Sequence, residues 1–364
     1  MKNIYIIYRN FLNKDLKTVS VGGIQTYLLN LCDVIQKIGA SPIICQISER
    51  NFESTYGDIK VFGFVANDKT LSKIVVKTLN LSSQPVIFGS HELIINYSGP
   101  SIAIQHGITW DTPVHSELSG LKNQLYTFQR ARMSFRLLQQ ISKVDHLVCV
   151  DYNFVNWYRT QVAHPDIDMT VVPNFADSQN KLEKPSDFIN IIFARRLFWY
   201  RGTRLMLEVM DELLHEYSNI RITIAGSGPD ESLFVSKYAH NNRVEIIHYR
   251  SDESYKIHSD KHIAVVPTLG SEGTSLSLLE AMASHCAVVC TNVGGMTNIV
   301  IDGFNGLVIN PDKDSLKKAL VHLIENKDLR MRIAERGFDT VNNGFSLKLW
   351  KEKWYNIIKF VFNL

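Results

Sequence analysis

Short apolar runs alternate with longer stretches of polar or helical spacing along most of the chain. In the first half such runs lie at residues 4–8, 42–45, 61–65, 86–89 and 102–105. The second half repeats the pattern at residues 188–193, 222–226, 244–248, 262–267 and 287–290. A parallel strand buried on both faces has such a continuous apolar sequence. The alternation therefore predicts an α/β protein with doubly wound parallel sheets.

A polar segment near the middle of the chain predicts a domain boundary. Residues 178–187 are polar and contain lysine and proline, which is typical of a linker. A chain of 364 residues is long enough for two domains that each bury a core. We therefore predict one α/β domain over residues 1–177, a second over residues 188–344, and a final amphipathic helix over residues 345–364.

The segment after the apolar run 262–267 has the features of a ligand site. Helical spacing starts at Ser275, so a strand, a small-residue loop and a helix N-terminus follow one another. Backbone N–H groups at such a terminus bind phosphates at the carboxyl edge of an α/β sheet. Glu272 and Glu280 border the helix start, where a carboxylate suits the paired hydroxyls of a ribose. Residues 277–280 also fit a capping box, in which Glu280 only closes the helix.

Composition and charge exclude several classes of protein. Hydrophobic residues make up 45% of the chain and charged residues 21%, as in a soluble globular protein. The net charge of +3 argues against a dedicated nucleic-acid binder. The chain shows no signal-peptide pattern and no apolar run of ~18 residues, so we expect a cytoplasmic protein. The five cysteines are scattered through apolar runs without metal-site spacing, which favours buried thiols and no zinc.

The two glutamates also match a family signature. Glu272, seven intervening residues and Glu280, followed by Ala-Met-Ala, resemble the signature of retaining GT-B glycosyltransferases of family 4. The resemblance implies two Rossmann-like domains facing a cleft, with the last helix packing back on the first domain. It places Glu272 near the donor sugar and Glu280 on the nucleotide ribose. The rest of the predicted donor loop is Gly273, Thr274, Ser275 and Leu276.

Residues 194–202 resemble the family's Gly-Arg-Leu-x3-Lys-Gly segment. Arg196 fills the arginine position and Arg201 the lysine position, while Ala194 is taken to replace the glycine. These cations come after a strand and before a helix, where they can neutralise the charge that develops on a departing diphosphate. The resemblance therefore implies transfer without a metal cofactor. Gly226, in a Gly-x-Gly-Pro segment after another strand, is expected near the nucleotide.

The first domain supplies further candidates. Gly22 and Gly23 lie between a strand and a helix, and the family has a similar glycine-rich loop near the donor. His106 follows the apolar run 102–105, at a position where the family often has a histidine on the donor sugar. We predict that His106 contacts the sugar or the incoming hydroxyl. Further candidates for contacts to the acceptor or sugar are His91, Glu92 and Asp111.

A basic segment over residues 121–144 contains five Lys or Arg residues and no acidic residue. Its apolar residues have helical spacing, so a helix is predicted. Such a helix can lie on an anionic membrane surface, where many members of the family glycosylate lipid-linked acceptors. The alternative is a solvated helix that covers the sheet.

The resemblance implies a retaining, metal-independent transferase that moves a sugar from a nucleoside-diphosphate sugar to a glycan or lipid-linked acceptor. We expect a role in bacterial surface polysaccharide biosynthesis and a location in the cytoplasm or at the inner face of the cytoplasmic membrane. The alternatives are a sugar-nucleotide epimerase and a non-catalytic partner subunit, which departures from the family pattern at Ala194, Phe175 and Asn298 leave open. Asp166 and Asp168 match a metal motif of another glycosyltransferase fold, which we interpret as coincidence.

Overall fold

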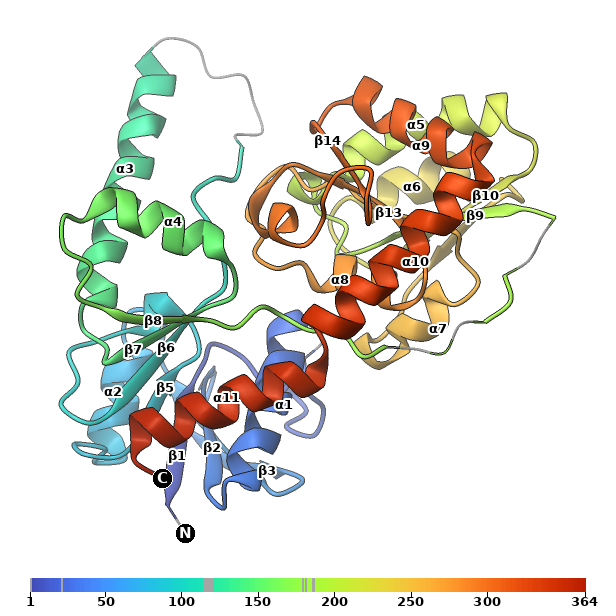
Figure 1. The fold of residues 1–364 in the computed structure, drawn as a ribbon. Coiled ribbons are helices and arrows are strands. Elements are labelled where there is room, and N and C mark those ends of the chain that lie inside the picture. Colours follow the sequence, from blue (N-terminus) through green and yellow to red (C-terminus); the bar gives the residue numbers. More distant parts are fainter. Residues whose placement is uncertain (1, 21, 114–120, 179, 181, 185–186) are drawn as a thin grey trace. The chain divides into compact units, whose positions relative to one another are not determined.

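The computed structural model describes residues 2–20, 22–113, 121–178, 180, 182–184 and 187–364 (Figure 1). The chain divides into two compact units. The first comprises Met1–His106, Ser116–Pro173 and Lys348–Leu364, and the second comprises Gly107–His115 and Asn174–Leu347. Each unit contains one largely or wholly parallel sheet flanked by helices, so the predicted α/β class with two Rossmann-like domains is confirmed.

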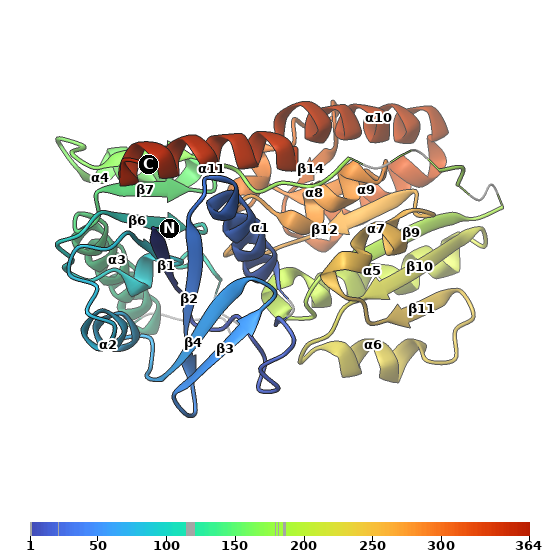
Figure 2. The ribbon, with the colours of Figure 1, turned by 90° about the horizontal axis from the view of Figure 1, so that it is seen from below.

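The sheet of the first unit has eight strands in the order β3-β4-β2-β1-β5-β6-β7-β8. All neighbours are parallel except β3 and β4, which form an antiparallel hairpin at the sheet margin (Figure 2). The apolar runs predict the central strands, but β3 has a polar sequence that gave no strand signal. The strands are β1 (Asn3–Ile7), β2 (Ser41–Ser48), β3 (Phe52–Tyr56), β4 (Ile59–Val65), β5 (Val86–Phe88), β6 (Ser101–Gln105), β7 (His146–Cys149) and β8 (Asp168–Val171).

The last helix of the chain, α11 (Leu347–Phe362), packs on the first unit, as predicted. Trp354 donates its indole N–H to the hydroxyl of Tyr27 over 2.9 Å, and both side chains are buried. Lys351 pairs with Asp33 at 2.7 Å. The other helices of this unit are α1 (Gly23–Lys37), α2 (Leu71–Thr78), η1 (His91–Leu93), α3 (Leu121–Ile141) and α4 (Tyr152–Gln161).

The second unit has a six-stranded, fully parallel sheet in the order β11-β10-β9-β12-β13-β14. Successive residues of β9 face two separate apolar layers, as alternation along a strand requires: Ile191 and Phe193 face one layer, and Ile192 faces the other. The strands are β9 (Ile189–Ala194), β10 (Ile220–Ala225), β11 (Val244–Ile247), β12 (Ile263–Val266), β13 (Ala287–Thr291) and β14 (Leu307–Ile309).

The helices of the second unit cover both faces of its sheet. Those packed with the layer of Ile191 include α5 and α9, whereas α8 belongs to the other layer. They are η2 (Trp199–Arg201), α5 (Thr203–Glu216), α6 (Glu231–Tyr238), η3 (Ser251–Glu253), α7 (Ser254–His258), α8 (Leu276–Ala283), η4 (Gly294–Asn298), α9 (Lys313–Glu325) and α10 (Lys327–Gly344). In the described ranges, no helix is long and apolar enough to cross a bilayer.

The unit boundaries differ from the predicted domain ranges at three places, one of which is the start of the final segment, where residues 345–347 belong to the second unit. Residues 107–115 and the whole of residues 174–187 are grouped with the second unit. The reason is local bonding: Asn174 donates to the carbonyl of Thr274 over 2.6 Å, and the Lys184 ammonium donates to the carbonyl of His285 over 2.6 Å. Within the predicted linker, residues 179, 181 and 185–186 lie outside the described residues.

Candidate functional site

Most of the predicted donor residues lie at the carboxyl edge of the second sheet. Because all six strands run parallel, the loops that follow them emerge at the same edge. Arg196 and Arg201 follow β9, Gly226 follows β10, and Glu272 lies in the loop between β12 and α8. The sheet topology therefore brings together segments that are up to 76 residues apart in sequence.

The carboxylate of Glu272 is held by three donors. Its Oε2 accepts from Arg195 Nη2 at 2.7 Å, from Thr268 Oγ1 at 3.0 Å, and from Nη1 of Arg201. Only 11% of the Glu272 side chain is exposed. Burial alone would raise the pKa of Glu272, but the charges of Arg201 and Arg195 outweigh burial and hold the pKa below its usual value. Glu272 is therefore a fixed anion in the folded protein.

Arg195, which sequence reasoning missed, is the buried arginine of the pair that follows β9. Arg196, the predicted ligand, is exposed, and its guanidinium lies 5.7 Å from the ring centre of Phe198. Successive side chains along an extended chain point in opposite directions, so only one of two adjacent arginines can face Glu272. The sequence does not indicate which one does. A role for Arg196 on the diphosphate stays a prediction.

The position of Arg195 also corrects the comparison with the family motif. The motif has glycine directly before its arginine, so counting back from Arg196 places Arg195, and not Ala194, at the glycine position. Burial lowers the pKa of Arg195, and neither its Nε nor its Nη1 has a hydrogen-bond partner in the described part of the chain. Two guanidinium groups against one carboxylate leave this cluster with a net positive charge, which suits an anionic ligand.

Glu280 lies in a different environment eight residues further on. Its Oε2 accepts from Ser254 Oγ of α7 at 2.7 Å, and burial raises its pKa to about 7. The capping-box alternative is wrong, because α8 starts at Leu276 after the N-cap residue Ser275 and Glu280 is the fifth helical residue. Glu280 is therefore protonated about half of the time at neutral pH, and hydroxyl donors from a ligand would favour its charged form.

The loop between the two glutamates is fixed mainly through its backbone. The carbonyl of Thr274 accepts from the Asn174 amide, and the hydroxyl of Ser275 lies 3.2 Å from that of Ser277. Gly273 and Leu276 border these residues. Gly226, with φ of 140°, lies directly against the carbonyl of Arg195, where no side chain fits.

The predicted residues of the first unit lie at the carboxyl ends of its strands and at the start of α1. His106 follows β6, and its Nε2 donates to the carbonyl of Gly89 over 2.9 Å in the neutral tautomer. Burial lowers the pKa of His106 to about 4, so the ring is neutral at pH 7 and Nδ1 is an acceptor. Gly22 is the N-cap residue of α1 and Gly23 its first residue.

The weaker candidates fall into two places. Glu92 accepts from Ser90 Oγ and lies 3.5 Å from both Arg9 Nη2 and His91 Nε2, so these side chains form a cluster in the first unit. Asp111 belongs to the second unit, where its carboxylate accepts from the backbone N–H of Ser271 over 2.6 Å. Sequence reasoning had no signal for that bond.

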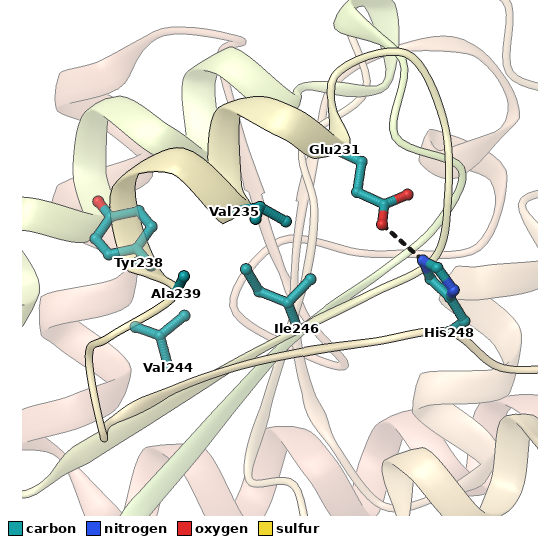
Figure 3. Close-up of a pocket in the computed structure, with 7 residues that line it drawn as sticks. All are labelled: Glu231, Val235, Tyr238, Ala239, Val244, Ile246 and His248. Carbon is teal, nitrogen blue, oxygen red and sulfur yellow. Dashed lines mark hydrogen bonds and ion pairs between the residues drawn. The ribbon is translucent and has the colours of Figure 1, made fainter.

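A separate hollow of about 330 Å³ lies between α6 and β11 (Figure 3). Val235, Val244 and Ile246 line it, and the pair Glu231 and His248, 2.7 Å apart, closes one end. None of the predicted site residues lines this hollow. The candidate site of the second unit is therefore the cluster around Glu272 and Glu280, and the first unit has its own candidate group around His106.

Comparisons with known proteins agree with this geometry. Residues 174–340 match the family described as glycosyl transferases group 1. The chain is 25% identical over 328 residues to the phosphatidylinositol N-acetylglucosaminyltransferase gpi3 subunit of Schizosaccharomyces pombe, covering 83% of this chain and 70% of that protein. It is 26% identical over 189 residues to the capsular polysaccharide biosynthesis glycosyltransferase CapM of Staphylococcus aureus, covering 49% of each chain.

The fold resembles that of solved structures over the full length. Sucrose-phosphate synthase from Thermosynechococcus elongatus superposes with a TM-score of 0.77, covering 100% of both chains at 14% sequence identity. Likeness at that identity concerns the fold, which is shared across both units.

Proposed function

We propose that the chain, whose residues 174–340 match the glycosyl transferases group 1 family, is a GT-B glycosyltransferase that transfers a sugar from a nucleoside-diphosphate sugar to a hydroxyl acceptor with retention. The observation that carries this proposal is the pairing of a cationic cluster around Glu272 with the buried carboxyl group of Glu280 at one sheet edge. A sugar nucleotide offers matching groups: a diphosphate, a ribose diol and sugar hydroxyls.

In this proposal, arginine side chains stabilise the leaving diphosphate. Breaking the bond between sugar and phosphate builds negative charge on the phosphate oxygens, and preorganised cations stabilise that charge without reorganisation. Arg195 and Arg201 provide the positive charge at the edge, and exposed Arg196 can add a further contact. The proposed reaction needs no metal cofactor, because these cations take the place of one at the diphosphate.

The two carboxylates have separate roles in the proposal. Glu280 accepts hydrogen bonds from the ribose hydroxyls, each contributing ~1.5–3 kcal/mol when the acceptor is charged. Glu272 uses Oε2 for its three protein donors, and its other oxygen, Oε1, is assigned to a hydroxyl of the donor sugar. Gly273 to Leu276 contribute the amides at the start of α8.

His106 acts as a hydrogen-bond acceptor in the proposal. Because its pKa is about 4, it is neutral at pH 7, and because Nε2 donates to Gly89, only Nδ1 can accept. It therefore suits a hydroxyl of the donor sugar or of the acceptor and does not serve as a cation for the diphosphate. The leaving phosphate is then the group that takes the acceptor proton in front-side transfer.

The acceptor is proposed to be a glycan or a lipid-linked glycan of a bacterial surface polysaccharide. The name of the Staphylococcus aureus relative supports a bacterial polysaccharide, and the name of the Schizosaccharomyces pombe relative supports an acceptor that carries a lipid. We assign the reaction to the cytoplasmic face of the membrane. An epimerase would give a product without any acceptor, so product analysis separates the two classes.

Helix α3 supports peripheral membrane contact. It extends away from the sheet of the first unit (Figure 1), and Phe128 and Phe135 are 67% and 60% exposed among arginines such as Arg132 and Arg136. This exposure does not fit a helix that covers the sheet along its length. Apolar side chains with flanking cations bind anionic bilayers. The protein should sediment with phosphatidylglycerol vesicles at low salt, and the double variant Phe128→Ser/Phe135→Ser should stay in the supernatant.

Calorimetric titration with UDP-, GDP-, dTDP- and ADP-sugars, with and without EDTA, tests the function. One nucleotide class should bind in the presence of EDTA, and binding should be lost in Glu280→Ala. Incubation of that donor with membrane glycolipid extract should then give a product whose anomeric configuration, read by NMR, matches the donor. Binding without product from any extract would contradict the proposal and favour a non-catalytic subunit.

A further inference from the structure

A short segment after His106 packs on the loop that carries Glu272. Residues Gly107–His115 belong to the second unit, although the residues before and after them belong to the first. We call the described part, residues 107–113, the strap. Asp111 of the strap accepts from the backbone N–H of Ser271 over 2.6 Å. None of the roles proposed above uses this bond.

The strap and the loop approach each other at backbone distance on both sides of Glu272. A Cβ added to Gly107 would lie 2.8 Å from the amide nitrogen of Gly273. A Cβ added to Gly270 would lie 2.7 Å from Cα of Thr112. Only glycine permits such approaches, since any side chain would collide with backbone atoms that cannot move aside. The close contact therefore requires glycine at position 107 of the strap and at position 270 of the loop.

Ser271, whose backbone N–H donates to Asp111, has an unusual backbone conformation. Its φ of 58° lies in the left-handed region, which costs a residue with a side chain ~1–2 kcal/mol. Such conformations persist when surrounding contacts enforce them. Ser271 directly precedes Glu272, so its backbone angles set the direction in which the Glu272 carboxylate leaves the loop. The bond from Asp111 is one contact that maintains those angles.

We propose that Asp111 is a positioning residue that holds Glu272 in place for the donor sugar through the Ser271 amide. The proposal rests on the sugar-binding role given to Glu272 under the proposed function. It predicts a selective defect. When residue 111 has no oxygen to accept from the Ser271 amide, the nucleotide still binds through Glu280, but the sugar loses its hydrogen bond to Glu272. His106 directly precedes the strap in the chain, five positions before Asp111.

The test compares affinities for a sugar nucleotide and for the same nucleotide without sugar. The probes are UDP-glucose with UDP and GDP-mannose with GDP, measured by calorimetry at pH 8. In Asp111→Leu, the gain in affinity from the sugar should fall by about tenfold, as expected for one charged hydrogen bond, while the free nucleotide binds within about twofold of wild type. Asp111→Asn, which keeps an oxygen acceptor, should restore most of the gain, and Thr112→Ala should behave as wild type.

A second readout does not depend on activity. Hydrogen exchange of a peptide over residues 268–276 should be faster in Asp111→Leu than in wild type, and a peptide over residues 287–291 should be unchanged. If no nucleotide binds wild type, the proposed function fails, and the exchange result still decides the positioning claim. Unchanged exchange at residues 268–276, or equal loss of affinity for nucleotide and sugar nucleotide, would overturn it.

Discussion

Glu272 and Glu280 are two buried carboxyl groups at the same sheet edge with opposite electrostatic environments. Two guanidinium groups and a hydroxyl surround Glu272 and hold its pKa below the usual value. In the part of the chain that the structure describes, Glu280 has one hydroxyl donor, Ser254, and no cation among the groups that shift its pKa, which burial raises to about 7. Burial is common to both, so the charged neighbours decide the protonation state.

The difference indicates how each carboxylate can be used. A carboxylate with permanent counter-charges is fixed in position before a ligand arrives, as a group that orients a sugar must be. A carboxyl group without a counter-charge, such as Glu280, becomes a stable anion only when further donors bind it. A ribose diol supplies two hydroxyl donors. Four experiments test this difference between the two carboxylates.

Removal of Arg195 should have the largest effect. Arg195→Met leaves the buried Glu272 carboxylate with a single cation, and breaking one partner of a buried ion pair typically costs ~3–5 kcal/mol of unfolding free energy. Denaturant unfolding measures the loss. The matched control is Arg196→Met, which removes the exposed neighbour and should change stability by less than ~0.5 kcal/mol. Equal losses of stability in the two variants would contradict the assignment of Arg195 as the buried partner of Glu272.

Glu280→Ala should weaken nucleotide binding by ~2–4 kcal/mol, because two charged hydrogen bonds to the ribose are lost. Calorimetry with the nucleotide that wild type binds gives the value. A variant that binds like wild type would show that the ribose lies elsewhere.

The contribution of Glu280 to the stability of the free protein should fall as the pH rises from 5 to 8. The folded pKa of Glu280, about 7, is above its unfolded value, so its contribution is fully present below pH ~4.5 and is lost as the pH rises through 7. The loss is at most ~3 kcal/mol. Thermal unfolding of wild type and Glu280→Gln across this range isolates the contribution, and identical slopes for the two proteins would refute it.

Ser254→Ala should have the smallest effect of the four. The variant removes the one hydroxyl that donates to Glu280, which disfavours the charged carboxylate and costs ~1 kcal/mol of nucleotide affinity at pH 7. The deficit should shrink above pH 8, where the carboxylate is charged in either protein. A deficit that is constant with pH would indicate loss of packing alone.

The sequence predicts the framework of the molecule better than the details of its site. Central strands such as β6 and β12 are buried on both faces, so most of their residues are apolar. The apolar runs in the sequence therefore predict these strands. The hairpin strand β3 is polar and partly exposed, so it has no such signal. The family resemblance implies the return of α11 to the first unit, and the spacing alone does not. This return includes the bond from Trp354 to Tyr27, which joins segments that are distant in the sequence.

The site illustrates the same limit. The spacing of Glu272 and Glu280 places both beside the start of α8, but their environments depend on residues from other loops. Which of Arg195 and Arg196 faces Glu272 depends on the direction of the chain after β9. The bond from Asp111 to Ser271 joins residues 160 positions apart, which no local pattern indicates.

Proton release on donor binding tests the contrast between the two carboxylates most directly. Calorimetric titration of UDP-glucose or GDP-mannose in buffers of different ionisation enthalpy measures it, and these sugar nucleotides have no group that titrates near neutral pH. With a Glu280 pKa of about 7 in the free protein, ~0.9 proton should leave at pH 6 and almost none at pH 8.5. Glu280→Gln should release none at either pH. Donor binding without proton release at pH 6 would contradict the assignment of Glu280 to the ribose.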